Sequence, residues 1–275
     1  MEEFLSLCKD DNPVKINNFL NNNRKLIIYF KDKNGWLTFH HVCKCGHKNI
    51  IEWLIKNKLI TDINSLTADG KSAIEIACTN DHYRVVEYLL NEKADICIKS
   101  KDEYKLLHIA VKNNNLYIVD LLLNQGNVNA NAKDSDESTA LHLAARNNLH
   151  SITKYLIRDG HADIDEIDHN SNTALHIACE NGNYDIVQIL LYNNAKINYR
   201  NHKGWTPLHL ACKYNQKEIF QILIDHKADI QMTTYDDQSA FKIAVINNSS
   251  SIIKYLLKLN LESNENKKDI LSLLN

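Results

Sequence analysis

A short phrase recurs at nearly constant spacing along this chain. Its clearest copies begin at Thr139, Thr173 and Thr206, and in each of them a His follows three residues later. The His position, or the residue that replaces it, occurs seven times at steps of 35, 33, 34, 34, 33 and 33 residues: His40, Glu75, His108, His142, His176, His209 and Lys242. A fixed period of this length is typical of repeat proteins, in which each unit buries its apolar face against its neighbours.

One copy of the repeat can be interpreted from its own residues. In the fifth copy, residues 174–179 are mostly apolar and Gly182 follows them, which indicates a short helix that ends in a tight turn. Residues 185–191 then place their apolar side chains on one side of a second helix. Residues 195–198 lead into a polar loop. We therefore expect each repeat to consist of a helix, a turn, a second helix and a hairpin-like loop.

The phrase and its period resemble those of the ankyrin repeat family, and the resemblance extends over almost the whole chain. It implies an all-α solenoid of stacked helix-turn-helix units with hairpin-like finger loops. We expect a single array over 1–275, with an N-terminal cap at 1–31, seven repeats at 32–260 and a C-terminal capping helix at 261–275.

The two ends and the glycines refine this division. Residues 1–31 should form a helix pair whose inner face carries Ile16, Phe19 and Leu20, and 267–274 should close the array after a loop at 262–266. All seven glycines fall where a turn is expected, in a finger loop, between the helices or just after the second helix: Gly35, Gly70, Gly204, Gly46, Gly182, Gly126 and Gly160.

The Thr and the His of the phrase have separate structural roles. The hydroxyl of Thr206 can cap the first helix of its repeat. In the ankyrin family the His bonds to the Thr and to neighbouring turns, and the resemblance assigns this role to His108, His142, His176 and His209. The match is incomplete at His40, where Leu37 replaces the Thr. Glu75 and Lys242 replace the His in the second and seventh repeats, so those loops should be held less firmly.

The cysteines indicate a reducing compartment. One group recurs three residues after the phrase His or at the matching place near the N-terminus: Cys8, Cys43, Cys78, Cys179 and Cys212. Equivalent helices in stacked repeats lie roughly 8–10 Å apart, which is too far for a disulfide. We expect these thiols to be reduced and mostly buried, Cys45 and Cys97 to be the most reactive, and the protein to be cytoplasmic.

Charge and hydropathy argue against several classes of partner. The formal net charge of −2 and a pI near 6.7 provide no basic surface for nucleic acid or anionic membrane. The N-terminus carries acidic residues where a signal peptide needs basic ones, and the longest apolar run, 26–30, is far below the roughly 20 residues that cross a bilayer. We therefore expect a soluble monomer that binds neither nucleic acid nor membrane.

The segment His40–His47 offers a metal-binding alternative. It contains five side chains of the zinc-ligand type within eight residues. A structural zinc site needs four converging ligands, and only His40 and Cys43 would share one helix face. Both also coincide with ordinary structural positions of the repeat, so we favour core packing here and expect no metal or other cofactor. Because no nucleophile, base and pocket combine anywhere in the pattern, we also expect no enzyme.

Aromatic residues identify the candidate binding surface. Trp36, Tyr104 and Trp205 occupy one finger position, and such residues are enriched at binding hot spots. We expect Trp205, Tyr214 and Ile246 to form an exposed apolar patch; the alternative is that they are scattered surface residues or are covered by the C-terminal helix. Lys213 belongs to a repeat position that is often basic: Lys44, Lys112, Arg146 and Lys213. In the ankyrin family this position faces the concave groove. We interpret these residues mainly as a solvated face, with binding of an acidic partner as the alternative.

Two further groups of residues have less specific interpretations. One position of the second helix holds large side chains at the repeat period, which predicts core: Trp53, Tyr88, Leu121, Tyr155, Ile189, Ile222 and Tyr255. The Asn runs at 21–23 and 113–115 are interpreted as compositional bias in solvated loops.

These features together favour a non-catalytic protein-interaction module or scaffold. It would present a rigid concave face and finger loops to a protein or peptide partner. Two alternatives remain open: a regulatory subunit or host-directed effector that acts on a partner enzyme, and a metal-binding protein centred on His40–His47.

Overall fold

The computed structural model describes residues 2–9, 13–23, 30–96, 106–126 and 128–262. The chain divides into two compact units, Met1–Ser135 and Asp136–Asn275. Secondary structure in the described ranges consists of α-helices and three isolated β-bridges in finger loops, so the prediction of an all-α repeat fold is confirmed. The expected closing helix at 267–274 lies outside the described residues, as do Tyr104 and Cys97.

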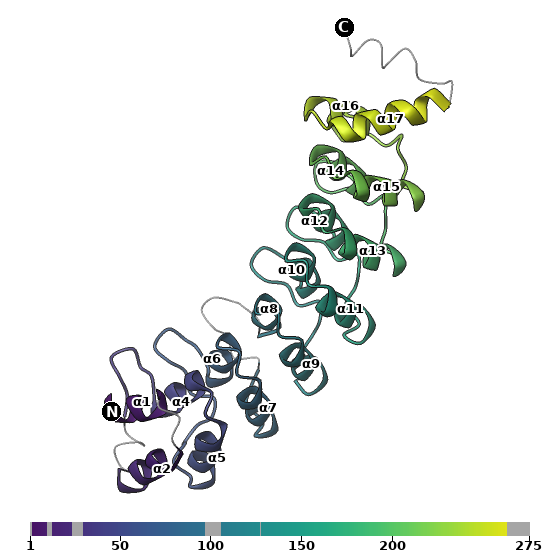
Figure 1. Cartoon of the computed structure of the whole chain (residues 1–275). Helices are drawn as coiled ribbons and strands as arrows, with labels where there is room; N and C mark the ends of the chain where they lie inside the picture. Colours follow the sequence, from purple (N-terminus) through teal and green to yellow (C-terminus); the bar gives the residue numbers. More distant parts are fainter. Residues whose placement is uncertain (1, 10–12, 24–29, 97–105, 127, 263–275) are drawn as a thin grey trace. The chain divides into compact units, whose positions relative to one another are not determined.

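The first unit contains a helix pair and three repeats (Figure 1). Its helices are α1 (Glu2–Lys9) and α2 (Pro13–Asn22), then α4 (Thr38–Cys45) and α5 (Lys48–Lys56), α6 (Ala73–Thr79) and α7 (Tyr83–Asn91), and α8 (Leu106–Lys112) and α9 (Leu116–Asn124). Each first helix packs against the next first helix, and each second helix against the next second helix. At the N-terminal end Leu20 is fully buried and Phe19 stacks on Phe4, with ring centroids 5.6 Å apart. The side chain of Ile16 lies outside the described residues.

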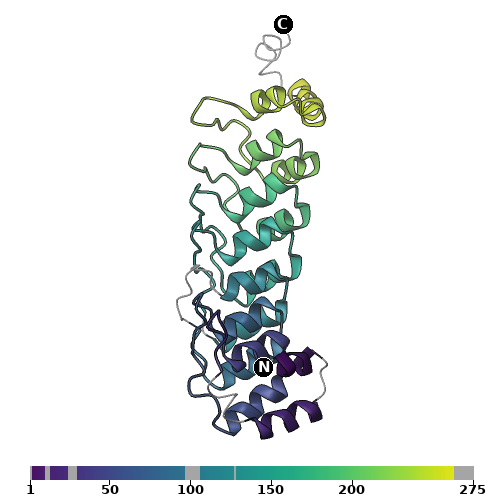
Figure 2. The same cartoon turned by 90° about the vertical axis from the view of Figure 1, so that its left-hand side faces the viewer.

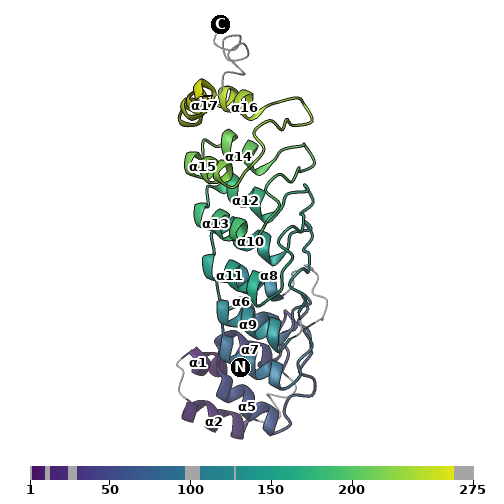
Figure 3. The same ribbon diagram turned by 90° about the vertical axis from the view of Figure 1, so that its right-hand side faces the viewer.

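The second unit repeats this arrangement four times. Its helices are α10 (Ala140–Arg146) and α11 (His150–Arg158), α12 (Ala174–Asn181) and α13 (Tyr184–Tyr192), α14 (Pro207–Lys213) and α15 (Lys217–Asp225), and α16 (Ala240–Ile246) and α17 (Ser250–Glu262). Within this unit the finger loops lie on one side, the first helices in the middle and the second helices on the opposite side (Figures 2 and 3). Glu262, expected in a loop, is the last residue of α17.

The fifth repeat shows why the sequence pattern gives this stack. Helix α12 buries Leu175, Ala178 and Cys179, and α13 buries Ile186 and Leu190, all at 1% exposure or less. Each large side chain buried this way contributes about 1.5–3 kcal/mol. The small Ala and Cys side chains allow neighbouring first helices to approach closely, which explains why Cys recurs at this position.

The turn between the two helices requires a left-handed residue in every repeat. Its position is held by Gly, Asn or Asp, with φ between 54° and 79°: Gly46, Asp81, Asn114, Asn148, Gly182, Asn215 and Asn248. Glycine has no Cβ to clash in this conformation, and Asn and Asp tolerate it better than other residues do. Gly160, in contrast, is not left-handed; the residue that follows it, His161, has φ 53°.

The Asn run at 113–115 lies in a largely solvent-exposed turn, as expected, and its residues also have structural functions. Asn114 supplies the left-handed turn, with φ 56°. The side chain of Asn115 accepts a hydrogen bond from the Ile118 backbone at 2.9 Å and so caps α9. Asn113 donates to the Cys78 carbonyl of the preceding repeat at 3.0 Å. Each residue of the run has a structural function.

The second-helix position predicted as core is mostly half-buried instead. Leu121 and Ile222 are buried there, whereas the other five members are intermediate: Trp53, Tyr88, Tyr155, Ile189 and Tyr255. The second helices form the outer layer of each unit, so residues at the edge of their apolar face keep one side in solvent. Tyr and Trp suit such a place because they combine an apolar ring with a polar group that water can satisfy. None of the helices in the described ranges is long and apolar enough to cross a bilayer.

Candidate protein-binding surface

In two successive fingers of the second unit, a polar residue at the base of the loop fixes its shape. Asp168 Oδ1 accepts hydrogen bonds from the Asn170 and Asn172 backbones at 2.9 and 2.8 Å. Asn201 does the same in the next finger, where its Oδ1 accepts from the Trp205 backbone at 3.0 Å. Neighbouring fingers are also joined, since the backbone N–H of His202 donates to the Asn170 carbonyl at 3.1 Å. The finger that carries Trp205 is therefore held from within and from its neighbour.

Three buried histidines of the second unit each connect a finger to the first helix of the preceding repeat. His176 is fully buried; its Nδ1 accepts from the Thr173 backbone at 3.2 Å, and its Nε2 bonds to the Trp205 carbonyl at 3.1 Å. His142 and His209 make equivalent bonds, with Nε2 3.0 Å from a loop carbonyl in each case. The carbonyl only accepts, so Nε2 carries a proton, and Nδ1 accepts the Thr backbone N–H, so it carries none; these rings are therefore neutral. The finger position of Trp205 thus depends directly on His176.

Burial and bonding also change the acidity of these rings. Burial lowers the pKa of His176 to about 4, against the opposing effect of its hydrogen bond to Trp205. Burial likewise lowers the pKa of His209 to about 4. Protonation would place a second N–H at Nδ1, facing the Thr N–H that this nitrogen now accepts. The same geometry that fixes the finger therefore disfavours the charged ring.

Of the repeats that depart from the phrase, the His40 repeat keeps the same bonds and the Glu75 repeat uses a different one. His40, which lacks the Thr, still accepts from the Leu37 backbone at 3.1 Å and bonds to the Ser65 carbonyl at 2.9 Å. This geometry needs only a backbone N–H, so the missing hydroxyl does not prevent it. Where Glu75 replaces the His, the Ser72 hydroxyl caps the helix by accepting from the Glu75 backbone at 3.3 Å.

The His40–His47 segment is occupied by structural interactions. Both ring nitrogens of His40 are engaged, as described above, and Cys43 is fully buried. His41 Nε2 lies 3.1 Å from Asp32 Oδ2, and its ring is 5.2 Å from that of Trp36. Within the described ranges there is no group of three or more His, Cys, Asp or Glu side chains that could hold a metal ion.

The structure brings Trp205, Lys213 and Tyr214 together on the finger side of the second unit. Lys213 Nζ lies 5.3 Å from the Trp205 ring centroid and 4.8 Å from that of Tyr214. Tyr214 Oη donates to Glu180 Oε1 of the preceding repeat at 2.8 Å. A cation over two aromatic faces is an attractive arrangement that also orders the lysine. We call these four side chains the finger cluster.

The surface that carries Trp205, Tyr214 and Ile246 combines apolar and charged groups. Trp205 is half-buried, and Lys213 covers two of the three aromatic and aliphatic side chains that were expected to be bare. Ile246, 58% exposed, occupies the equivalent position of the next repeat, on α16, which packs against α14. The surface at this place is amphipathic, because aromatic rings, a cation and a carboxylate alternate with an exposed aliphatic side chain.

A similar pair recurs in the first unit. Lys44 Nζ lies 5.5 Å from the Trp36 ring centroid. This pair borders a hollow of about 640 Å³ that the first two fingers and α4 form, with Asp32, His41 and Asp69 also in its lining. In both units the Lys follows the Trp by eight residues, 36 to 44 and 205 to 213. That spacing is the sequence signal that would have identified the pairing.

These features define the class of protein as a helical repeat protein whose fingers are rigidly positioned. Models of ankyrin repeats match the chain over residues 7–100, 107–201 and 193–269. Because these matches cover most of the sequence, the chain belongs to the ankyrin repeat family.

Two yeast proteins are among its curated relatives. A stretch of 105 residues is 28% identical to the probable 26S proteasome regulatory subunit p28 of Saccharomyces cerevisiae, covering 38% of this chain and 46% of the relative. Another, of 153 residues, is 27% identical to the Target of rapamycin complex 2 subunit AVO2 of the same yeast, covering 43% of this chain and 36% of the relative. The chain thus spans less than half the length of each of these relatives.

Proposed function

We propose that this chain is a cytoplasmic, monomeric protein-interaction module that binds a protein or peptide partner through the finger cluster and Ile246. The observation that carries the proposal is the position of Lys213 Nζ over both the Trp205 and the Tyr214 rings. This contact holds three side chains of hot-spot size in one arrangement before any partner arrives. Preorganisation of this kind reduces the entropy lost on binding.

The chemistry of the cluster suggests what a partner would offer. Trp and Tyr provide broad contact surfaces, and Ile246 adds an exposed aliphatic side chain one repeat further along. Lys213 would favour a carboxylate on the partner near the aromatic rings. The partner segment would therefore combine an acidic residue with an apolar one. The Trp36 and Lys44 pair, together with Tyr104, would supply a second contact region.

The comparisons favour a second, narrower function. Both relatives are named as subunits, one of the 26S proteasome and one of Target of rapamycin complex 2. We therefore regard a regulatory subunit of a partner enzyme as the leading form of this function, ahead of a host-directed effector. In either form the chain would act by binding and not by catalysis, and without nucleic acid or membrane as its partner.

Affinity capture with matched variants tests the proposal. Tagged wild-type protein is compared with Trp205→Ala and Lys213→Ala, and Tyr184→Ala serves as control because Tyr184 is 38% exposed on a second helix. We expect Trp205→Ala to weaken capture by about 2 kcal/mol, or roughly thirtyfold, with an unchanged melting temperature. If the finger-cluster variants and the control retain the same partners equally well, the binding surface is elsewhere.

A further inference from the structure

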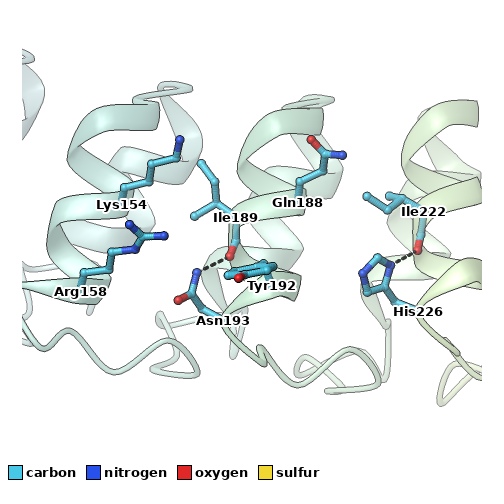
Figure 4. Close-up of a pocket in the computed structure, with 8 residues that line it drawn as sticks. All are labelled: Lys154, Arg158, Gln188, Ile189, Tyr192, Asn193, Ile222 and His226. Atoms are coloured by element: carbon cyan, nitrogen blue, oxygen red, sulfur yellow. Dashed lines mark hydrogen bonds between the residues drawn. The ribbon is translucent and has the colours of Figure 1, made fainter.

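A hollow of about 350 Å³ lies among the second helices of the second unit. Side chains from α11, α13 and α15 face the same space (Figure 4). Its apolar part consists of Ile189, which is half-buried, and Ile222, which is 8% exposed. Tyr192 borders it with 79% of its surface exposed, the highest value among the large apolar side chains that the structure describes. A highly exposed aromatic side chain next to the apolar surface of Ile189 and Ile222 is suited to contact with another molecule.

The polar part of the hollow is basic. Lys154 and Arg158, one helical turn apart on α11, line one side, and His226 lines the other. No Asp or Glu is among the described residues of the lining. Across the described ranges neither Lys154 nor Arg158 has an ion pair or side-chain hydrogen bond, whereas Lys196 in the same unit lies 3.7 Å from Asp165. Two adjacent cations thus remain uncompensated in a chain whose net charge is negative.

His226 and Asn193 are oriented by bonds to their own helices. His226 Nδ1 bonds to the Ile222 carbonyl at 2.9 Å, and Asn193 Nδ2 donates to the Ile189 carbonyl at 2.7 Å. Since the carbonyl accepts, the proton of the neutral His226 ring is on Nδ1 and Nε2 is left for another group. These two side chains at the edge of the hollow are therefore held in position.

We propose that this hollow binds an acidic peptide segment of a partner protein, at a site separate from the finger cluster. One or two carboxylates would pair with Lys154 and Arg158, and an apolar side chain would pack on Ile189 and Ile222 beside Tyr192. Neighbouring helices lie roughly 8–10 Å apart. An extended chain covers that distance in about three residues. The segment thus carries an acidic residue and, three positions away, a large apolar one.

Charge and shape favour a peptide over a lipid surface. Arg and carboxylate form directed, paired hydrogen bonds, and an apolar floor beside two cations matches a side chain next to an acid. An anionic membrane, in contrast, attracts proteins through clusters of about four to eight basic residues. The lining of this hollow supplies only three basic groups.

Selection from a random peptide library displayed on phage tests this site. The wild-type chain is the target, and the selected consensus is synthesised with a fluorescein label together with a copy in which Gln replaces each acidic residue. Both peptides are titrated by fluorescence anisotropy against wild type and against a Lys154→Glu/Arg158→Glu variant. A milder Lys154→Gln/Arg158→Gln variant is included in case the charge reversal disturbs α11. Lys203→Glu/Lys217→Glu gives the same change in net charge at exposed residues outside the lining.

We expect a consensus with an acidic residue three positions from an apolar one. The affinity of the labelled peptide should fall by about tenfold or more in both Lys154/Arg158 variants. The Gln peptide should lose a similar amount, and Lys203→Glu/Lys217→Glu should bind like wild type. Trp205→Ala should also bind this peptide normally, so failure here is distinguishable from failure of the finger cluster. Recovery of no such peptide, or peptide binding that is the same in wild type and the Lys154/Arg158 variants, would overturn the proposal. So would binding of the wild type to phosphatidylserine vesicles that these variants lose, if no peptide binds.

Discussion

The buried histidines predict a specific loss of stability in mild acid. His176 has a pKa of about 4 in the folded chain, whereas an unfolded chain titrates it near 6.5. At a pH below the pKa of the unfolded chain, His176 binds a proton in the unfolded state but remains neutral in the folded state. Folding free energy is therefore fully present above about pH 6.5 and is lost as the pH falls toward 4. The perturbation that tests this is His176→Gln, which removes the titrating group.

The magnitude follows from the two pKa values. One pKa unit corresponds to about 1.4 kcal/mol, so His176 alone should cost about 2 kcal/mol of stability when the pH is lowered from about 7.5 to about 5. At the higher pH, His176→Gln should itself destabilise by about 1–3 kcal/mol, because the buried Thr173 N–H and the Trp205 carbonyl lose their partner. The wild type and the variant should therefore approach each other in stability as the pH falls.

Urea unfolding followed by tryptophan fluorescence measures this locally. The chain has three Trp residues, so a Trp36→Phe/Trp53→Phe background leaves Trp205 as the reporter. Its carbonyl is the group that His176 bonds, so the probe reports the repeat in question. Ile186→Val is the control, since it should reduce stability by about 1 kcal/mol without removing a titrating group. Equal dependence on pH in wild type and His176→Gln would refute the reasoning, whatever the stability of the variant at neutral pH.

Two further predictions concern the cysteines and the turn between helices. Four thiols are buried and free: Cys43, Cys78, Cys179 and Cys212. Burial raises the pKa of each of these thiols. In native protein they should therefore resist dithionitrobenzoate, whereas half-buried Cys45 should react. A disulfide mapped between any two of the four would contradict their packing. Asn148 has a left-handed backbone, with φ 57°. Asn148→Gly should therefore be tolerated, whereas Asn148→Ala should lower the unfolding free energy by about 1 kcal/mol. Equal urea midpoints for these two variants would contradict the backbone requirement.

The fold could be predicted from the sequence because one repeated pattern specifies all its parts together. The period gives the repeat, the apolar spacing gives the two helices, and Gly46 and Gly182 mark turns that the structure shows to be left-handed. The role of Asn114 was missed because Asn-rich runs resemble solvated loops, and only the aligned backbone reveals that Asn replaces Gly there. Periodicity likewise predicted core for Tyr155, although it cannot distinguish a buried face from the half-exposed edge of an outer layer.

The candidate site was less predictable, for a physical reason. Sequence identified Trp205 and Tyr214 by type and position, but a long Lys side chain can extend into solvent or fold onto a ring, and only the coordinates show that Lys213 lies over both rings. The basic hollow was not anticipated at all. Its lining comes from three different repeats, and its basic residues Lys154, Arg158 and His226 occupy three different repeat positions, so no periodic pattern of charge joins them.

The most direct test of the binding surface is site-specific photocrosslinking in cells of the native source. A photoreactive residue replaces Ile246, 58% exposed beside the finger cluster, and in a parallel protein it replaces Val14, 67% exposed on α2. If the finger face of the second unit binds the partner, one discrete crosslinked protein appears from position 246, disappears in a Trp205→Ala background and is absent from position 14. Crosslinks of the same partner from both positions, or from 246 regardless of Trp205, would contradict the assignment of this surface.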